Sequence, residues 1–326
     1  MSEINNTIDV LGDDITVSKI IDKSIDTFSD SVLTSIGNYA FYGCSQLTEV
    51  SFPAVTSIGN NVFYDCSQLA EALFPVATSI GSSAFRNCTQ LTDISFPLVT
   101  TISGYVFQSC TQLTEASFPA ATSIGSSAFT ECSQLTNISF PLVTSIGASA
   151  FYGCSQLTEV SFPAVTSIGG SAFYGCSKLT AASFPAVTSI SGNMFRYCRQ
   201  LAEALFPVAT SIGGSVFQDC SQLAEVSFPA VTSIGSASFQ SCTQLTEVSF
   251  PAVTSIAAYA FKGCSNLTKV ILGNTQQVCT LSGTNAFDNS ANAIIYVPDA
   301  LVDSYKAATN WSTLASRIKS MNELPA

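Results

Sequence analysis

The chain of 326 residues is 47% hydrophobic and only 10% charged, and it has a formal net charge of -11 and no histidine. Such an apolar composition predicts a folded protein and excludes intrinsic disorder. The absence of histidine excludes triads and metal sites that depend on imidazole. The excess of acidic side chains leaves no basis for binding nucleic acid, which requires clustered Lys and Arg.

The first 24 residues predict a cap for the fold that follows. Residues 1–30 hold no apolar run of the length found in signal peptides, so we expect no secretory leader in this chain. Two β-like runs flank Gly12, Asp13 and Asp14, and this pattern favours a hairpin that supplies a first strand. Such a strand would cover an otherwise open end of core and sheet.

A 22-residue repeat occurs eleven times between residues 25 and 266 and dominates the sequence. In one unit, LTEVSFPAVTSIGNNVFYDCSQ, apolar Val50 and Phe52 alternate with polar Glu49 and Ser51, which is the period-2 pattern of a half-buried strand. Pro53 follows, and a residue without an N–H cannot continue a ladder in the middle of a sheet. Each repeat therefore predicts one short strand that ends at a proline.

The second half of each repeat predicts a return path. The AVTSIG stretch favours a second short extended piece, and GNNVFYDC suits one helical turn that faces inward through Phe63. Gly59 marks the bend between them. Because Ser103, Ser191 and Ala257 replace this glycine in other repeats, we expect that the position does not require a positive φ.

One repeat is too small to bury its own apolar side chains, so neighbouring repeats must stack and share a core. The columns of Leu, Phe-Pro, Ile and Phe that recur in nearly every repeat are the predicted core. The sequence therefore predicts an α/β solenoid with a long parallel sheet on one side and short helical turns on the other.

Eleven of the twelve cysteines follow a strict 22-residue spacing. They are Cys44, Cys66, Cys88, Cys110, Cys132, Cys154, Cys176, Cys198, Cys220, Cys242 and Cys264. Disulfides and metal ligation are alternatives, but there is no Cys-x-x-Cys pair and no histidine, and an odd number leaves one thiol unpaired. We interpret the column as buried free thiols at a tight corner of each repeat. Cys279 lies outside the column and is the expected reactive thiol.

The end of the chain departs from the repeat. Residues 267–293 read as an irregular final repeat, in which Ala286 and Phe287 resume the motif out of register. Residues 294–326 predict a C-terminal cap with one strand and helices. We expect Asp299 to cap a first helix, a second helix to span Trp311–Met321, and Trp311 to lie in the core of the cap.

The repeat resembles the leucine-rich repeat of the BspA-like (Treponema pallidum type) family. The signature of that family is Leu-x-x-Leu-x-Leu-Pro followed by Ile-Gly-x-x-Ala-Phe-x-x-Cys, and this chain matches it at Pro53, Ile58, Gly59, Phe63 and Cys66, with Phe52 in place of the third Leu. The resemblance implies a curved right-handed solenoid with a concave parallel sheet. It also implies bacterial surface proteins that bind host matrix, other cells or mucosal material, without catalytic residues or cofactors. The closing segment is similar to those of Firmicutes proteins, some of them prophage-encoded.

A column of carboxylates provides the candidate binding site. It points away from the core at the start of the predicted strands and consists of Glu49, Glu71, Asp93, Glu115, Glu159, Glu203, Glu225 and Glu247. Like charges on rungs about 4.8 Å apart repel one another. The column is therefore either a solvated face that keeps the protein soluble, or a site for a basic partner or for weakly held Ca2+. The adjacent Ser51 column, interrupted by Leu73 and Leu205, suits glycan hydroxyls or simply close strand packing.

These patterns lead to a functional hypothesis. We expect a non-enzymatic recognition or adhesion module, a monomer without cofactors, that binds a protein or glycan of a host or neighbouring cell through the concave sheet. The expected location is extracellular or on a cell surface, with phage-associated and cytoplasmic locations as alternatives. We expect neither nucleic-acid binding nor membrane insertion. The alternative function is a structural spacer or assembly protein with no ligand on the sheet.

Overall fold

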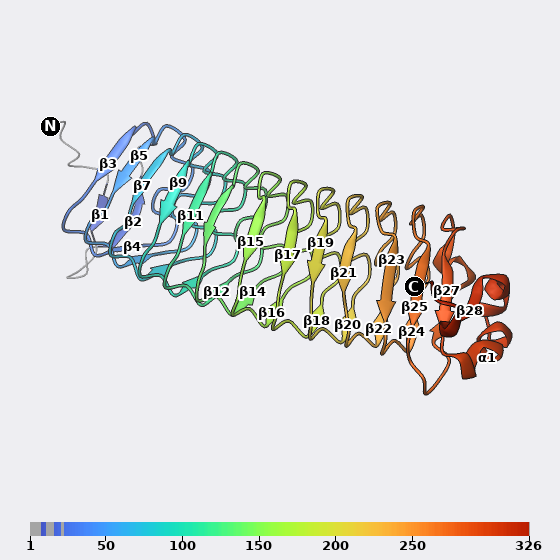
Figure 1. Cartoon of the computed structure of the whole chain (residues 1–326). Coiled ribbons are helices and arrows are strands. Elements are labelled where there is room, and N and C mark those ends of the chain that lie inside the picture. Colours follow the sequence, from blue (N-terminus) through green and yellow to red (C-terminus); the bar gives the residue numbers. More distant parts are fainter. Residues whose placement is uncertain (1–7, 11–15, 21–22, 326) are drawn as a thin grey trace. The chain divides into compact units, whose positions relative to one another are not determined.

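The computed structural model describes residues 8–10, 16–20 and 23–325. It divides into two compact units, Met1–Leu157 (unit 1) and Thr158–Ala326 (unit 2). In each unit the chain coils so that a long strand and a short strand recur once per repeat, and the arrows of the long strands lie side by side (Figure 1). The predicted solenoid of parallel strands is confirmed.

The long strands of unit 1 lie within the segments where strands were predicted, and all but the first end two residues before the proline. They are β3 (Thr27–Ser29), β5 (Glu49–Ser51), β7 (Glu71–Leu73), β9 (Asp93–Ser95), β11 (Glu115–Ser117) and β13 (Asn137–Ser139). β3, β5 and β7 form one parallel ladder, and β9, β11 and β13 form another. Equivalent residues of successive repeats are paired, as in Glu49 with Glu71 and Ser51 with Leu73. The repeat length therefore sets the register directly.

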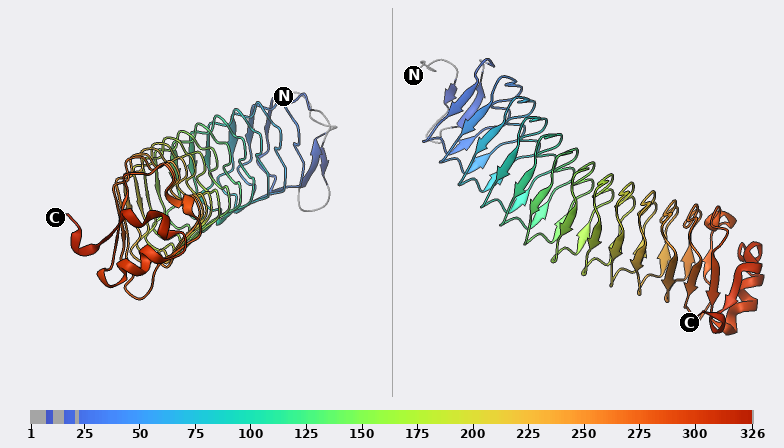
Figure 2. Two further views of the ribbon diagram at one scale, coloured as in Figure 1. Left: turned by 90° about the vertical axis from the view of Figure 1, so that its right-hand side faces the viewer. Right: turned by 45° about the horizontal axis from the view of Figure 1, so that its top comes forward.

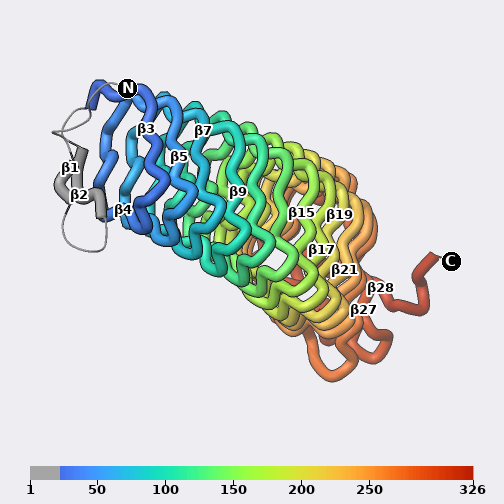
Figure 3. The backbone as a smooth tube through the Cα atoms, turned by 90° about the vertical axis from the view of Figure 1, so that its left-hand side faces the viewer, coloured from blue at the N-terminus to red at the C-terminus, as the bar shows by residue number. Residues whose placement is uncertain are grey.

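The short strands of unit 1 lie on a different side of the coil, as the positions of β3, β5, β7 and β4 in Figure 3 show. They are β4 (Ser35–Ile36), β6 (Ser57–Ile58), β8 (Ser79–Ile80), β10 (Thr101–Ile102), β12 (Ser123–Ile124) and β14 (Ser145–Ile146). The two β-like runs at the N terminus form β1 (Ile8–Val10) and β2 (Thr16–Ile20), which pair antiparallel, and β2 pairs in parallel with β4. The predicted turn residues Gly12, Asp13 and Asp14 lie outside the described residues.

Unit 2 repeats the same arrangement. Its long strands are β15 (Glu159–Ser161), β17 (Ala181–Ser183), β19 (Glu203–Leu205), β21 (Glu225–Ser227), β23 (Glu247–Phe250) and β25 (Lys269–Leu272). Its short strands are β16 (Ser167–Ile168), β18 (Ser189–Ile190), β20 (Ser211–Ile212), β22 (Ser233–Ile234), β24 (Ser255–Ile256) and β26 (Thr280–Leu281). The long-strand sheet continues from β25 through β27 (Ile294–Val297) to β28 (Ile318–Ser320).

Two ladders of phenylalanine fill the space between the strands. Phe52 stacks on Phe74 with ring centroids 5.4 Å apart, and Phe63 stacks on Phe85 at 5.1 Å. These rings are buried, and so is the inward residue Val50 of the strand. The equivalent Phe residues are buried in both units, whereas three of the equivalents of Val50 are half-buried, namely Ala72, Ile138 and Val226. The predicted core columns are therefore confirmed, and each ring depends on its neighbours in the adjacent repeats for its burial.

The predicted helical turn is not a helix. The segment that carries Phe63 consists of tight turns, with positive φ angles of 54° at Asn61 and 60° at Asp65. Two left-handed residues within one short segment interrupt any α-helical ladder. The backbone instead bonds to the next repeat: the Phe63 amide donates to the carbonyl of Ala84 at 2.7 Å. Helical structure is thus minor in the repeats.

The glycine at the bend is selected by close backbone approach. A Cβ added to Gly81 would lie 2.5 Å from the carbonyl carbon of Gly59 in the preceding repeat. Where Ser103 replaces this glycine, its hydroxyl donates to the carbonyl of Ile80 at 2.7 Å. No positive φ occurs at this position in either unit, so the expectation from the substitutions at Ser103, Ser191 and Ala257 is confirmed.

All twelve cysteines are buried as free thiols. The Cys66 thiol donates to the carbonyl of Phe41 at 3.1 Å, and the same bond recurs along both units. The expectation that Cys279 is reactive is wrong, because its side chain is fully buried and burial raises its pKa to about 12. In the irregular last repeat Ser290 takes the place of the cysteine, and its hydroxyl donates to the carbonyl of Phe261 at 2.6 Å.

The C-terminal segment contains η1 (Thr284–Phe287), η2 (Asp299–Leu301), α1 (Val302–Ala307), η3 (Trp311–Arg317) and η4 (Met321–Glu323). Figure 2 shows these helical segments against the last turns of unit 2, where α1 contacts β28. Asp299 does not cap a helix, since its carboxylate accepts a hydrogen bond from the Ser320 hydroxyl.

The second predicted helix ends early. Residues Trp311–Arg317 form a 3-10 helix, and Ile318–Ser320 pair with β27 as strand β28. Trp311 is fully buried, as predicted, and its indole N–H donates to the carbonyl of Cys279 at 2.6 Å. Among residues 8–10, 16–20 and 23–325, no helix is long and apolar enough to cross a membrane.

Candidate binding face on the long-strand sheets

The carboxylates of unit 1 project from the first residue of each long strand. Glu49, Glu71, Asp93 and Glu115 are all exposed, while the next residue along the strand faces the core. Glu49 pairs in register with Glu71, and Asp93 pairs with Glu115. The structure therefore brings four predicted site residues onto one face of the unit 1 sheets, with Asn137 on the next rung.

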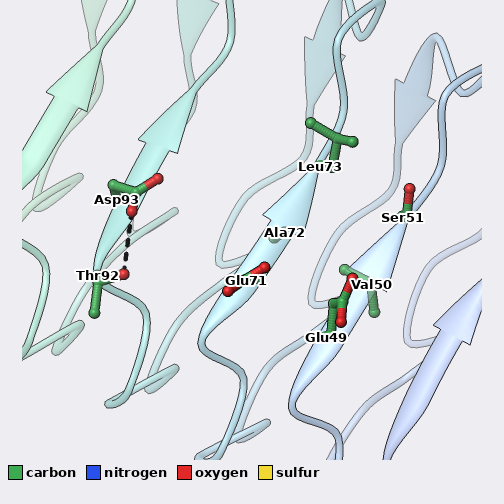
Figure 4. Close-up of a pocket in the computed structure, with 8 residues that line it drawn as sticks. All are labelled: Glu49, Val50, Ser51, Glu71, Ala72, Leu73, Thr92 and Asp93. Carbon is green, nitrogen blue, oxygen red and sulfur yellow. Dashed lines mark hydrogen bonds between the residues drawn. The ribbon is translucent and has the colours of Figure 1, made fainter.

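A surface cavity of about 260 Å³ lies among the first three of these carboxylates (Figure 4). It is lined by Glu49, Val50, Ser51, Glu71, Ala72, Leu73, Thr92 and Asp93. Leu73, where the neighbouring repeat has Ser51, is 56% exposed. In the sequence, Leu73 is an exception in the serine column. The replacement of serine by leucine at this position of the repeat was the signal in the sequence for this residue.

Hydrogen bonding leaves most of these carboxylates available to a partner. The Thr92 hydroxyl donates to Asp93 Oδ2 at 3.2 Å. The equivalent hydroxyl of the next repeat, that of Thr114, donates to the backbone carbonyl of Thr92 and not to a carboxylate. Within the described part of the chain, the carboxylates of Glu49 and Glu71 accept no hydrogen bond and form no ion pair. Their negative charge is therefore not compensated by the protein.

The column in unit 2 is less regular. Glu203 pairs in register with Glu225, but Ala181 separates Glu203 from Glu159. Glu247 forms an ion pair with Lys269 on the next strand, with Oε2 and Nζ 2.9 Å apart. The predicted residues of unit 2 thus form one adjacent pair of uncompensated carboxylates, one isolated carboxylate and one neutralised carboxylate.

The serine column lies beside the carboxylates on the same face. Ser95, Ser117 and Ser139 pair across β9, β11 and β13. Among the described residues, these hydroxyls make no side-chain hydrogen bond. The face therefore offers carboxylate acceptors, hydroxyl groups that both donate and accept, and one exposed leucine. This combination attracts cationic and hydrogen-bonding groups.

The described residues contain no group of three or more His, Cys, Asp and Glu side chains arranged to hold a metal ion. The carboxylates of the column are spaced by whole repeats, and each adjacent pair comes from equivalent positions of neighbouring strands. Such a row is a repeating surface of equivalent carboxylates.

A repeated strand, a shared phenylalanine core and a polar outer sheet face define a leucine-rich repeat protein. The family model described as "BspA type Leucine rich repeat region (6 copies)" matches residues 23–133, 122–246 and 232–322. These matches cover most of the chain, and the protein belongs to this family. The resemblance seen in the repeat signature is confirmed.

Solved bacterial structures are similar to this chain. A leucine-rich repeat protein from Bacteroides ovatus is 24% identical with a TM-score of 0.74, and the alignment covers 94% of this chain and 87% of that one. A leucine-rich cell surface protein from Faecalibacterium prausnitzii is 25% identical with a TM-score of 0.55, and the alignment covers 86% and 89% of the two chains. No curated protein matches the sequence.

Proposed function

We propose that this protein is a non-enzymatic recognition module of a bacterial cell surface that binds a protein partner through the long-strand sheet face. The observation that carries the proposal is the row of exposed, uncompensated carboxylates around the cavity at Leu73. A partner with Lys or Arg side chains around an apolar side chain complements this cavity in both charge and polarity. Similarity to the Faecalibacterium prausnitzii surface protein supports the proposed location.

The proposed mode of binding is electrostatic attraction followed by burial of Leu73. Clustered like charges on one face steer an oppositely charged partner, and the attraction weakens as salt screens it. The exposed Leu73, which lies beside the carboxylates at the other end of β7, contributes apolar area that is buried only in the complex. Repetition of the carboxylates on neighbouring strands within unit 1 allows an extended partner to engage several rungs at once.

The test compares the full chain with a triple variant, Glu49→Gln with Glu71→Gln and Asp93→Asn. Binding to bacterial cells, epithelial cells, mucin and matrix proteins is measured at low and high salt. We expect the variant to bind its protein target with an affinity at least about tenfold lower than that of the unmodified protein. We expect high salt to lower the affinity of the unmodified protein to a similar extent. A matched control removes the same charge elsewhere, with Glu131→Gln, Asp288→Asn and Asp303→Asn, all outside the long strands.

Two results would contradict the proposal. If the sheet variant and the control bind equally well to every target, the face has no ligand and the protein is a structural spacer. If binding is lost when glycans are removed from the target but survives when the target protein is digested, the partner of this face is a glycan.

A further inference from the structure

A second surface cavity, of about 230 Å³, lies on unit 2. It is lined by turn residues on either side of the buried cysteine column, and none of them belongs to a strand: Tyr197, Arg199, Asp219, Ser221, Ser241 and Thr243. The cavity is therefore distinct from the long-strand sheet face. The lining residues come from three successive repeats. In each repeat they are the residues directly before and directly after the cysteine.

Two arginines and two tyrosines cluster beside this cavity, and two of them, Tyr197 and Arg199, line it. The Arg196 guanidinium lies 4.9 Å from the ring centroid of Tyr197 and 6.0 Å from that of Tyr174. Arg196 Nη2 donates to the Tyr197 hydroxyl at 3.3 Å, while its Nε is buried without a hydrogen-bond partner. Arg199 lies 6.0 Å from the same Tyr197 ring. The Tyr197 ring thus makes cation–π contacts with both Arg196 and Arg199.

The remaining lining groups have unused hydrogen-bonding capacity. The hydroxyls of Ser221 and Thr243 donate to carbonyls of the preceding repeats, which leaves their oxygens as acceptors. Within the described part of the chain, the Asp219 carboxylate and the Ser241 hydroxyl make no side-chain hydrogen bond, and Asp219 forms no ion pair. The Asp219 carboxylate and the Arg199 guanidinium therefore line a small open space without forming an ion pair with each other.

Equivalent positions in unit 1 are satisfied internally. There, Asn87 Nδ2 donates to Asp65 Oδ1 at 2.7 Å, and the Ser109 hydroxyl donates to Glu131 Oε2 at 3.0 Å. Arg86 occupies the same repeat position as Arg196 and lies between Tyr64 and Tyr105, but the sequence there is Arg-Asn-Cys-Thr and not Arg-Tyr-Cys-Arg. The open cluster is thus a local departure from the repeat.

We propose that this cavity binds a single pyranose ring that carries a carboxylate, such as a terminal acidic residue of a glycan. A sugar ring presents hydroxyls that both donate and accept, which matches Asp219 and the Ser and Thr hydroxyls. Its carboxylate is recognised by Arg199, and the half-buried Arg196 beside the cavity adds to the positive potential. Tyr197 supplies an aromatic wall against the ring. A sulfate ion has no hydroxyl that can donate to Asp219, whereas a pyranose ring carries several such hydroxyls beside its carboxylate.

The test uses the full chain with three probes, galacturonic acid, N-acetylneuraminic acid and neutral galactose, observed by saturation-transfer NMR and titration calorimetry. We expect at least one acidic sugar to bind and galactose to bind at least about tenfold more weakly, because it lacks the group that a guanidinium recognises. Arg199→Ala and Asp219→Ala should each weaken acidic-sugar binding about tenfold. The matched control Arg86→Ala, in the equivalent cluster of unit 1, should leave binding unchanged.

Arg199 is exposed and Asp219 is half-buried, so circular dichroism can verify that both variants keep the fold. The proposal is overturned if neither acidic sugar shows saturation transfer, or if galactose binds as tightly as both of them. It is also overturned if Arg199→Ala binds the acidic sugar as well as the unmodified protein does, or if Arg86→Ala weakens binding to the same extent.

Discussion

At the scale of single residues, the stacked phenylalanines join each repeat to its neighbours. Phe217 is fully buried, and its ring lies 5.7 Å from that of Phe195 and 5.3 Å from that of Phe239. It also contacts the strand-end rings of Phe206 and Phe228. A core ring that bridges two neighbouring repeats contributes both apolar burial and the interface between those repeats.

Phe217→Ala should therefore lower the free energy of unfolding by about 3–5 kcal/mol, the usual cost of deleting a buried aromatic ring. Urea unfolding followed by circular dichroism measures this change. Val208→Ala serves as a control, because Val208 is 42% exposed and its truncation should change stability by no more than about 0.5 kcal/mol. Equal unfolding midpoints for Phe217→Ala and the unmodified protein would contradict the role of the ring in the core.

Much at this scale could be predicted from the sequence, because alternation within one short strand determines which side chains face outward. The exposure of Glu49 and the burial of Val50 follow from that pattern alone. The cavity beside Leu73 could not be predicted, since it depends on the shapes of side chains on three neighbouring strands. The ion pair between Glu247 and Lys269 required the pairing of β23 with β25 to be known.

At the scale of elements, the turn between the short strand and the cysteine is the part that the sequence predicted incorrectly. Residues of quite different kinds hold the same left-handed conformation two positions before the buried Phe, among them Asn61, Ser149, Ala237 and Tyr259. Side-chain preference therefore does not select this conformation. Hydrogen bonds between neighbouring repeats impose it, as in the bond from the Ala237 amide to the carbonyl of Ala258 at 3.0 Å.

This conformation leads to a prediction for Ala237, whose φ is 55°. Alanine in the left-handed region costs about 1–2 kcal/mol, and glycine avoids that cost while losing about 0.4–1 kcal/mol through the greater freedom of the unfolded chain. Ala237→Gly should therefore raise the free energy of unfolding by about 0.5–1 kcal/mol in urea unfolding.

Ala148→Gly is the matched control, since Ala148 lies in the equivalent turn of another repeat without a positive φ. This substitution should destabilise the protein by about 0.4–1 kcal/mol, because only the entropic effect remains. The same sign of change for both variants would show that left-handed strain at Ala237 is absent.

The C-terminal elements illustrate a second limit of sequence patterns. The apolar spacing in Trp311–Met321 is compatible with a helix, but the free edge of β27 recruits Ile318–Ser320 as a further parallel strand. Arg317 anchors this change of direction by donating from Nε to the carbonyl of Ala293 at 2.8 Å and from Nη2 to that of Ser290 at 2.7 Å. Tertiary hydrogen bonding thus overrides a local preference that the sequence alone favoured.

At the scale of the whole molecule, the repetition of one buried thiol per repeat makes stability depend on pH. Burial raises the pKa of the Cys88, Cys132, Cys198, Cys220 and Cys242 thiols well above the ordinary value of 9.0, and it raises that of Cys264 to about 12. The folded protein therefore keeps these protons at a pH where the unfolded chain releases them. Stability is fully present below about pH 9 and is lost as the pH rises toward 12.

The loss should be large because the thiols act together. Each buried thiol removes about 1.4 kcal/mol of stability for every pH unit above its unfolded pKa, and several thiols together equal the roughly 5–15 kcal/mol that stabilises a typical domain. We expect cooperative alkaline unfolding within about two pH units above pH 9, observed by circular dichroism at low ionic strength and accompanied by release of several protons per molecule.

Serine substitution isolates the contribution of the thiols, since Ser290 already fills the equivalent position without titrating in this range. We compare the free energy of unfolding at high pH with that at pH 7 for each protein. A double variant, Cys220→Ser with Cys242→Ser, should lose less of this free energy as the pH rises than the unmodified protein does. The remaining buried thiols still oppose folding at high pH, so the effect should be partial and should grow as further cysteines are replaced. If the urea midpoint of the unmodified protein stays constant from pH 8 to pH 11, the thiols either ionise in the folded state or are not enclosed by the stacked repeats.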